Sequence, residues 1–442
     1  MNIKHKKVLV YGLGKSGIGA IKLLKKHKTK IYYYDDNFKE EYFDDVPRLD
    51  FSKENIKNLD YIVVNPSISK YCENLVTAQI MNIKIISEVE LAFLLSKGKI
   101  ISVTGSNGKS TTVSLISHIL SSANVKNELV GNIGTSFCEK VAQKNKNNFV
   151  VEISSFQLET TSKYHSNIAC FLNFTENHLD RHFSLKEYFE TKLKIFNNQS
   201  KKDFAILNYD DEKVRGIKPK ANTYFFSKVT QVKGTFVEDE NIIFCDNKKF
   251  EKILPVRDIK LVGKHNLENI LCAVLVCKLF GIENEYIKEG VSSFYGINHR
   301  IEYVDNIEGI DFYNDSKSTT VKATQTALDC FAKKKILLIL GGSSKNIDYN
   351  PLFNSLPSSV KEILAIGDIK FELEKCAREN NFFSITICDN FKQAVKISLS
   401  KAREKNLDLV LLSPATASFD EFKNFEERGD NFKKLVEALK NE

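Results

Sequence analysis

The sequence predicts an α/β protein with three domains and largely parallel sheets. Short β-rich runs such as KVLVYG at residues 7–12 alternate with helix-like stretches along the whole chain, which is the pattern of βα units. At roughly 150 residues per domain, a chain of 442 residues has room for about three domains. New βα series begin after residue 95 and after residue 296. We therefore expect domains over residues 1–95, 96–296 and 297–442.

The expected elements follow from the apolar runs, taken in chain order. In the first domain we expect a helix that ends near Lys26, and strands at residues 7–12, 30–36, 61–67 and 83–87. In the second we expect a helix from Lys109 to about Ser122, and strands at 100–104, 148–154, 167–175 and 204–211. Residues 222–256 alternate apolar and polar side chains, which predicts an antiparallel region. In the third we expect strands within 335–342, 362–368, 384–390 and 407–415.

Composition excludes several classes of protein. Hydrophobic residues make up 42% and charged residues 27%, as is typical of a globular chain, and no apolar run is long enough to span a bilayer. The N-terminus lacks the apolar segment of a signal peptide, and nine cysteines without a CxxC pair favour a reducing compartment. The formal charge of +8 comes mostly from lysines, which favours a solvated surface over a nucleic-acid interface. We therefore expect a cytoplasmic protein that neither binds nucleic acid nor inserts into a membrane. We also expect a monomer.

A phosphate loop is the strongest functional motif. GSNGKST follows a predicted strand and opens a predicted helix, so backbone N–H groups can surround phosphate oxygens. Lys109 can reach the β- and γ-phosphates of ATP, and the hydroxyl of Ser110 can bind Mg²⁺. Val103 stands where the strict GxxxxGK[ST] motif has glycine, so this is the shorter TGxxGK[ST] form. The alternative is a glycine-rich turn with a surface lysine; the predicted ATP-binding residues are Gly105, Ser106, Asn107, Gly108, Lys109, Ser110 and Thr111.

A second glycine motif lies near the N-terminus. GLGKSG at residues 12–17 stands between a predicted strand and a predicted helix, and Asp35 and Asp36 end the next strand. This arrangement places a phosphate at a helix N-terminus and an acid on a ribose. One interpretation is a dinucleotide dehydrogenase, but hydride transfer has no use for the ATP-type loop about 90 residues later. A ligase with a nucleotide-linked substrate uses both; its predicted contacts are Gly12, Gly14, Ser16, Gly17, Asp35 and Asp36.

Three further residues form a candidate catalytic and metal-binding set. Glu152 lies near the end of a predicted strand, His178 follows another, and Lys192 sits 14 residues later in a helical stretch. The carboxylate and a neutral imidazole could hold a second Mg²⁺ beside the phosphates of ATP. Taken singly, these residues could equally be a strand-end acid, a loop histidine and a surface lysine without a role.

Motifs over essentially the whole chain resemble those of the Mur ligases, in the same order. They are TGSNGKST, VGNIG, EISSFQLE, LNFTENHLDRH, GKHNLEN, NHRIEYV and YNDSKSTT. SPATASFDEFKNFEERGDNF at residues 413–432 resembles the member that adds D-glutamate, and the DNPR segment of the member that adds a diamino acid is absent. The resemblance implies a Rossmann-like UDP-binding domain, an ATPase-like central domain with a phosphate loop, and a C-terminal Rossmann-like domain that binds the amino acid. The implied reaction is ATP-dependent addition of D-glutamate to UDP-N-acetylmuramoyl-L-alanine through an acyl phosphate, in peptidoglycan precursor synthesis.

The resemblance also implies roles for individual residues. Glu152 matches a magnesium carboxylate, and Asn132 and His178 match contacts to the muramoyl-alanine and a second metal. Lys192 is expected to carry a carbamate formed from CO₂, which turns a cation beside two Mg²⁺ ions into an anion. The ATP contacts are completed by Asn266, Asn269, Arg300 and Asp315. Lys15 stands where the family commonly has an apolar residue, and Ser67 where it has glycine, so the uridine-side contacts stay open.

The pocket for D-glutamate needs a cation and polar donors, because the substrate brings two carboxylates. Lys345 follows the strand-end KILLILGGSS, at the side where parallel sheets bind ligands. Ser418 and Phe425 resemble the family's contacts to the glutamate side chain, and Lys317 and Thr319 lie in the NDSKSTT loop. The alternative for Lys345 is a lysine that caps a turn.

Three other functions remain to be distinguished from this ligase. A folate polyglutamylating ligase shares the ATP loop but has no need of GLGKSG, and a dehydrogenase leaves GSNGKST idle. A non-enzymatic nucleotide sensor leaves His178 and Lys192 without a task. Phosphate release that requires both the UDP-sugar and D-glutamate distinguishes all three from the ligase.

Overall fold

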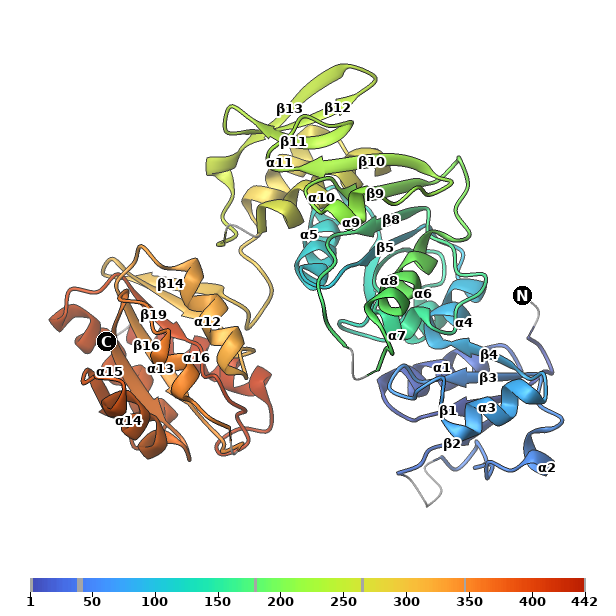
Figure 1. The fold of residues 1–442 in the computed structure, drawn as a ribbon, viewed down its shortest axis with the longest axis horizontal. Coiled ribbons are helices and arrows are strands. Elements are labelled where there is room, and N and C mark those ends of the chain that lie inside the picture. The colour runs from blue at the N-terminus through green and yellow to red at the C-terminus, as the bar shows by residue number, and fades with distance from the viewer. Residues whose placement is uncertain (1–2, 38–42, 179–180, 264–265, 346, 441–442) are drawn as a thin grey trace. The chain divides into compact units, whose positions relative to one another are not determined.

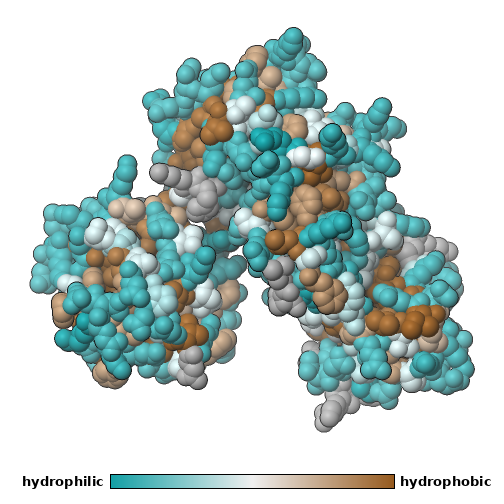
Figure 2. All heavy atoms as spheres, in the orientation of Figure 1, coloured by the Kyte–Doolittle hydropathy of each residue, from teal (hydrophilic) through white to brown (hydrophobic). Residues whose placement is uncertain are grey.

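A computed structural model shows an α/β protein with three separate sheets, so the predicted fold class is confirmed (Figure 1). The structure describes residues 3–37, 43–178, 181–263, 266–345 and 347–440. No described helix is long and apolar enough to cross a membrane. On the face drawn in Figure 2, hydrophilic residues cover most of the surface and hydrophobic ones lie among them in small groups.

The first sheet is parallel and has the order β2-β1-β3-β4. Its strands are β1 (Lys7–Tyr11), β2 (Lys30–Tyr34), β3 (Tyr61–Val64) and β4 (Lys84–Ser87), and the helices are α1 (Lys15–Lys26), α2 (Lys53–Ile56), α3 (Glu73–Ile80) and α4 (Glu88–Leu95). Successive residues of a strand face opposite sides of its sheet. In β1, Val8 and Val10 join one buried cluster while Leu9 and Tyr11 join another. Both faces are therefore covered, as the near-continuous apolar run requires.

The central sheet has nine strands in the order β13-β12-β11-β10-β9-β8-β5-β7-β6. The strands are β5 (Ile100–Thr104), β6 (Asn127–Gly131), β7 (Asn148–Glu152), β8 (Ile168–Phe171), β9 (Phe204–Asn208), β10 (Asn222–Ser227), β11 (Gly234–Glu238), β12 (Asn241–Asp246) and β13 (Lys249–Pro255). The helices are α5 (Lys109–Ser122), α6 (Phe137–Lys144), α7 (Ser155–Leu158), α8 (Leu185–Leu193), α9 (Glu212–Arg215), α10 (Asn266–Phe280) and α11 (Asn284–Ser292). The pairings from β6 to β11 are parallel, so the carboxyl ends of β5, β7 and β8 meet at one edge.

The predicted antiparallel region over 222–256 is wrong in its first strand. β10 pairs parallel with both β9 and β11, and only β11, β12 and β13 are antiparallel. The tight turns at Asp239–Glu240 and Asn247–Lys248 have positive φ at both residues, as two-residue hairpins favour. Alternation of apolar and polar residues indicates that one face of a strand is buried. It does not indicate whether the neighbouring strand is parallel or antiparallel.

The third sheet has the order β14-β15-β19-β16-β17-β18, and only the β14–β15 pair is antiparallel. Its strands are β14 (Glu302–Ile307), β15 (Ile310–Asn314), β16 (Ile336–Gly341), β17 (Val360–Ile366), β18 (Ile385–Ile387) and β19 (Leu409–Leu412). The helices are α12 (Val321–Cys330), α13 (Asn350–Asn354), α14 (Lys370–Glu379), α15 (Phe391–Glu404) and α16 (Phe425–Leu439). β16 is buried along its whole length, with alternate residues in two different core clusters.

The chain forms two compact units. One comprises residues 1–259 and 267–294 and holds the first two sheets, and the other comprises residues 260–266 and 295–442 and holds the third. The boundaries expected at residues 95 and 296 stay predictions.

Candidate active site

The phosphate loop joins β5 to α5, as its sequence predicts. Gly108 caps the helix with φ +82°, a left-handed conformation that favours glycine. A Cβ atom placed there would lie 2.2 Å from Oδ1 of Asn269, so the close packing of α10 also requires glycine. Asn269 thus lies directly beside the loop, and its Oδ1 accepts a hydrogen bond from Thr112 at 3.3 Å.

The phosphate loop is hydrogen-bonded to a neighbouring segment and to the side chain of its own lysine. Backbone N–H groups of Ser106 and Asn107 donate to the carbonyl and side-chain oxygens of Asn173, at 2.9 and 2.8 Å. The Nζ of Lys109 donates to the carbonyls of Gly105 and Ser106, both at 2.9 Å. The contacts with Asn173 therefore fix the shape of the loop. The ammonium of Lys109 lies over the loop, where the phosphates are expected to bind.

Ser110, Glu152 and Asn132 meet beside the loop. Ser110 Oγ donates to Glu152 Oε2 at 2.6 Å, and Asn132 Nδ2 donates to Oε1 of the same carboxylate at 2.8 Å. Glu152 ends β7 and Asn132 directly follows β6, so the parallel register brings them to the edge where β5 ends. The carboxylate is buried, with 2% of the residue exposed.

Lys192 is the buried cation of the site. It lies on α8 with 2% of its surface exposed, and its Nζ is 3.0 Å from the carbonyl of Gly105 and 3.4 Å from Oγ1 of Thr104. The same Nζ lies 4.8 Å from the ring centre of Tyr188. Burial, and next the charge of Lys109, lower the pKa of Lys192 to about 7. A large share of this amine is therefore neutral near pH 7, unlike that of a surface lysine.

His178 lies against aromatic rings. Its imidazole is 5.0 Å from the ring of Phe156 and 6.0 Å from that of Tyr188, and its backbone φ is +57°. Tyr188 thus contacts both His178 and Lys192. Within the described part of the chain, no three His, Cys, Asp or Glu side chains gather into a metal-binding group.

The glycine loop of the first sheet is built around its own acid. Gly12 has φ +92°, a left-handed conformation that favours glycine. A Cβ atom on Gly17 would lie 1.9 Å from the carbonyl oxygen of Gly12, so the first turn of α1 requires glycine at position 17. The buried carboxylate of Asp35 accepts a hydrogen bond from the backbone N–H of Leu13 at 2.6 Å. The structure thus places Asp35 inside the loop.

The other predicted residues of this region lie around the loop. Asp36 is exposed and accepts a hydrogen bond from the Tyr11 hydroxyl at 2.9 Å, and Ser16 lies in the first turn of α1. Ser67 Oγ turns back to Oδ1 of Asn65 at 2.9 Å.

In the second unit, the structure gathers most of the predicted amino-acid contacts. The Nζ of Lys345 donates to the carbonyl of Thr319 at 3.1 Å, and the Nζ of Lys317 lies 5.8 Å from the ring centre of Phe425. Ser418 is buried, with 2% exposed. Arg428 is 1% exposed and holds this region together, because its guanidinium donates to the carbonyls of Ser316, Thr416 and Ala417 at 3.0 to 3.1 Å.

The remaining predicted ATP contacts also lie in this unit. Asp315 is buried and accepts hydrogen bonds from Ser413 Oγ at 2.7 Å and from the N–H of Ile301 at 3.2 Å, and burial raises its pKa to about 6. Arg300 is exposed. Asn266 Nδ2 donates to the carbonyl of Val262 at 2.6 Å.

Comparison with known proteins decides the family. Residues 103–277 match the family model described as "Mur ligase middle domain". Residues 299–416 match the one described as "Mur ligase, glutamate ligase domain". A UDP-N-acetylmuramoylalanine–D-glutamate ligase of Thermoanaerobacter sp. (strain X514) is 38% identical over 456 residues, covering 100% of both chains. Ligases of the same name from two other organisms are similar to this chain. That of Koribacter versatilis is 38% identical over 99% of both chains, and that of Clostridioides difficile is 36% identical over 100% of both. The chain belongs to the Mur ligase family.

Solved structures show the same fold. UDP-N-acetylmuramate–alanine ligase MurC of Thermotoga maritima matches with a TM-score of 0.60 and 17% identity, over 98% of this chain and 100% of that one. The MurF ligase of the same organism, in complex with ADP, matches with a TM-score of 0.57 and 17% identity, over 99% and 96%. The family matches and the relatives confirm the family that the motifs resemble, and these solved structures agree with its fold. Leu179 and Asp180 of LNFTENHLDRH, and Lys264 and His265 of GKHNLEN, lie outside the described residues.

The oxygen donors beside the phosphate loop fit Mg²⁺. This ion prefers oxygen ligands and binds through one or two carboxylates together with phosphates and water. Ser110 and Glu152 supply a hydroxyl and a carboxylate that already touch, and Asn132 orients the carboxylate from its other oxygen. Lys192 fits such a site only as a neutral or negatively charged group, since an ammonium repels the ion.

Sequence reasoning missed three residues that organise these sites. Tyr188 joins His178 to Lys192, Arg428 ties two loops of the second unit, and Arg181 connects the first sheet to the central one. A usable signal was the rarity of arginine, with eight in the whole chain. Arg181 and Arg428 both lie within motifs already singled out, where lysine is otherwise the usual cation.

Proposed function

We propose that the chain joins D-glutamate to UDP-N-acetylmuramoyl-L-alanine with ATP, as an amide-forming ligase of peptidoglycan precursor synthesis. In this reaction a carboxylate oxygen of the alanyl group attacks the γ-phosphorus of ATP, and the bond to ADP breaks. The neutral amine of D-glutamate then attacks the acyl phosphate, and phosphate leaves. Curated relatives with this activity in their names match along the full chain.

One observation supports the ATP site above all others. Lys109 and Lys192 both donate to the carbonyl of Gly105, which puts two amines side by side at a strand–loop–helix phosphate site. The Lys109 ammonium suits the crowded negative charge of a polyphosphate that meets a carboxylate. The neutral Lys192 amine lies beside it, where a carbamate would meet bound Mg²⁺. Lys109 would bind the β- and γ-phosphates, and the backbone N–H groups at the start of α5 would donate hydrogen bonds to the phosphate oxygens.

We place two Mg²⁺ ions in this site, one of them at Ser110 and Glu152. When bound, they would neutralise charge on the phosphates and the attacking carboxylate. His178 and Lys192 are the proposed contacts for the second ion, with Tyr188 holding both side chains in place.

Lys192 is proposed to carry a carbamate. Its lowered pKa supports this, because only a neutral amine can attack CO₂. The neutral nitrogen gains a bond to the carbon of CO₂ and loses one proton to solvent, while one C=O bond of CO₂ becomes a C–O⁻ bond, so a neutral amine becomes an anionic carbamate. The charge near the bound cations then becomes favourable.

The two other substrates are assigned to separate regions. The glycine loop of the first domain (1–95), with Asn132 and His178 of the central domain (96–296), would bind the UDP-sugar. Residues of the C-terminal domain (297–442) would bind D-glutamate: Lys317, Thr319, Lys345, Ser418 and Phe425. Asn266, Asn269, Arg300 and Asp315 would complete the ATP contacts. The protein is proposed to act as a monomer in the cytoplasm.

Phosphate release tests the proposed function. Purified protein with ATP and Mg²⁺ is given UDP-N-acetylmuramoyl-L-alanine, D-glutamate, both, or neither. We expect sustained release only with both substrates, and a product heavier by one glutamyl residue. Sustained release with either substrate alone, or with L-glutamate in place of the D-isomer, would contradict the proposal.

A further inference from the structure

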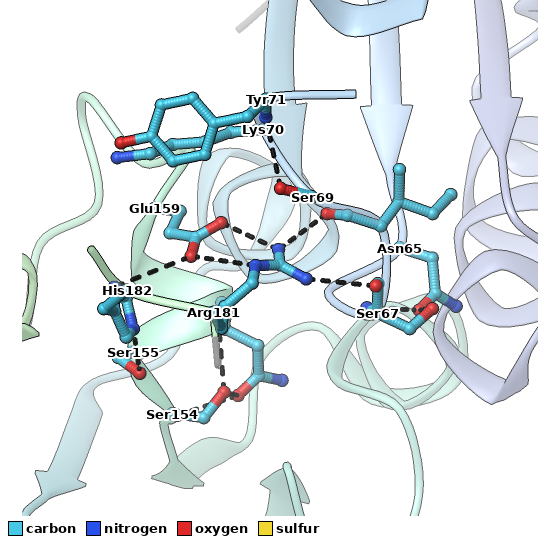
Figure 3. A network of polar contacts seen from close by, with 12 residues as sticks. Asn65, Ser67, Ser69, Lys70, Tyr71, Ser154, Ser155, Glu159, Arg181 and His182 are labelled. Carbon is cyan, nitrogen blue, oxygen red and sulfur yellow. Dashed lines mark hydrogen bonds and ion pairs between the residues drawn. The ribbon is translucent and has the colours of Figure 1, made fainter. Parts of the chain in front are cut away.

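Arg181 lies where the first sheet meets the central one. Its guanidinium pairs with the carboxylate of Glu159, with Nε 3.3 Å from Oε1 and Nη2 2.8 Å from Oε2 (Figure 3). The remaining donors reach the backbone carbonyls of Ser67 (Nη1, 3.0 Å) and Ile68 (Nη2, 2.7 Å). The side chains of Arg181 and Glu159 are 12% and 3% exposed. A nearly buried ion pair thus holds a loop that lies more than a hundred residues away in the sequence.

A second contact holds the same loop. Glu187 accepts a hydrogen bond from the Tyr71 hydroxyl at 2.6 Å and pairs with the Nζ of Lys70 at 2.9 Å. We call residues 65–71 the bridging loop. Arg181 comes three residues after His178, and Glu187 comes five residues before Lys192. The loop is therefore fastened to the two chain segments that carry these proposed active-site groups.

The bridging loop also packs on the glycine loop of the first sheet. The N–H of Asn65 donates to the carbonyl of Tyr11 at 2.9 Å. A Cβ atom placed on Gly12 or Gly14 would lie within 2.7 and 2.9 Å of the Asn65 side chain. A change in the position of this loop is therefore transmitted directly to the proposed binding site of the uridine diphosphate.

We infer that Arg181 is a positioning residue that fixes the distance between the uridine-diphosphate end and the muramoyl-alanine end of the substrate. The inference rests on the proposed function, since it requires a substrate that reaches from the glycine loop to the site of His178. Arginine suits the role because its planar fork binds a carboxylate with two donors and keeps others for carbonyls. Lysine has a single nitrogen and cannot make all four contacts at once.

Binding of two ligands separates this role from a merely structural one. UDP occupies only the first domain, whereas UDP-N-acetylmuramoyl-L-alanine must also reach the central domain. Calorimetry on the full chain compares the wild type with Arg181→Ala and Arg181→Lys. We expect both variants to bind UDP within about twofold of the wild type, and Arg181→Ala to bind the full substrate roughly 10- to 100-fold more weakly. Arg181→Lys should recover only part of that loss.

A matched control is Arg215→Ala. Arg181 lies 4.9 Å from the ring centre of Phe156. Arg215 likewise lies over an aromatic ring, that of Tyr209, and donates to the Tyr209 carbonyl, but it is exposed and is not bonded to the bridging loop. It should leave the affinities for both ligands unchanged. Equal losses for UDP and the full substrate in Arg181→Ala, or no loss for either, would overturn the inference.

A second variant covers the case in which Arg181→Ala does not fold. Glu159→Gln keeps the shape of the ion pair while removing its charge, and it should show the same selective loss with a smaller magnitude. An unselective or absent loss in Glu159→Gln would also overturn the inference. Substrate-dependent phosphate release by the wild type tests the proposed function separately, so the two failures are distinguishable.

Discussion

Two turns of this molecule have the same local design and opposite charge. β1 leads through Gly12 into α1, and β5 leads through Gly105 into α5, each by a glycine loop with positive φ. In the first loop the buried carboxylate of Asp35 accepts a hydrogen bond from the backbone N–H of Leu13. In the second, two amines contact the loop carbonyls instead.

This difference shows how one strand–glycine–helix pattern can serve two ligands. A carboxylate inside a loop disfavours a dense polyanion close by. In the second loop the N–H groups of Ser106 and Asn107 are taken by Asn173, which brings no charge. The ammonium of Lys109 over the second loop favours a polyphosphate. We conclude that the second loop is adapted to ATP and the first to the less crowded charge of a nucleotide-linked sugar.

The largest effect is expected from removing the loop cation. Lys109→Ala should lower ATP turnover on the order of 10²- to 10³-fold or more, because preorganised charge at the transferring phosphoryl group is lost. The fold should persist, since this side chain lies over the loop rather than in a core. Phosphate release and a thermal melt measure the two effects. Lys126→Ala, an exposed lysine of the same compact unit, is the control, and near-normal turnover in Lys109→Ala would disprove the phosphate-loop assignment.

Lys192 gives the next largest effect, and it depends on pH and CO₂. Since its pKa is about 7, the neutral amine becomes about tenfold scarcer with each pH unit below 7. Turnover should therefore fall in that range in CO₂-depleted buffer, and added bicarbonate should restore it. Lys192→Met should lower turnover at every pH, and added bicarbonate should not restore it. Mass analysis of an active, liganded sample that shows unmodified Lys192 would remove the carbamate proposal.

The same lysine predicts a pH-dependent stability. The folded state holds fewer protons than the unfolded state between about pH 7 and the ordinary lysine pKa of 10.5, so stability rises with pH in that window. Below pH 7 both states are protonated, and the full cost of the buried charge remains. Lys192→Met in CO₂-free buffer should thus exceed the wild type in stability most at pH 7 and below. The gap should shrink as pH rises, by up to about 1.4 kcal/mol per pH unit; a constant gap in denaturant melts would contradict this.

Much of the fold was predictable because the strands are buried on both faces. Continuous apolar runs such as that of β16 predict parallel strands, and all six residues of β16 are buried. The start of α5 at Lys109 was likewise predictable from its glycine loop. The direction of β10 was not, because pairing direction depends on how the chain crosses over and not on which side chains it buries.

The residues of the candidate site were predictable where they share one sequence motif. Contacts between residues of different segments were harder to predict. Ser110 and Glu152 could be named, but only the parallel register of β5, β7 and β6 explains why Asn132 touches the same carboxylate. Asp35 was expected to meet a ribose, and the structure places its carboxylate on the loop backbone. Such contacts depend on distances between elements, which no local pattern contains.

A third glycine turn extends the comparison to the second unit. Gly341 ends β16 and Gly342 follows it, both with positive φ, and Lys345 just beyond them contacts the carbonyl of Thr319. Lys345→Ala should raise the KM for D-glutamate roughly 10- to 150-fold, the equivalent of about 1.5–3 kcal/mol for a charge-assisted hydrogen bond. The KM values for ATP and the UDP-sugar should change little. Lys396→Ala, an exposed lysine of α15, is the control, and equal losses for all three substrates would take Lys345 off the glutamate site.

The smallest effect should come from the acid in the first loop. Asp35→Asn keeps an oxygen for the N–H of Leu13 but loses the charge, so a charge-assisted hydrogen bond becomes a neutral one, at a cost of about 1 kcal/mol. We expect the melting temperature to fall by about 2–4 °C. The affinity for UDP should change by less than about fivefold, because the lost repulsion of the phosphates opposes the weaker loop. An acid that instead binds the ribose would be lost as a direct contact, and calorimetry would then show UDP affinity falling by roughly tenfold or more. That result would make Asp35 a direct contact to the ribose of UDP and end the contrast between the two turns.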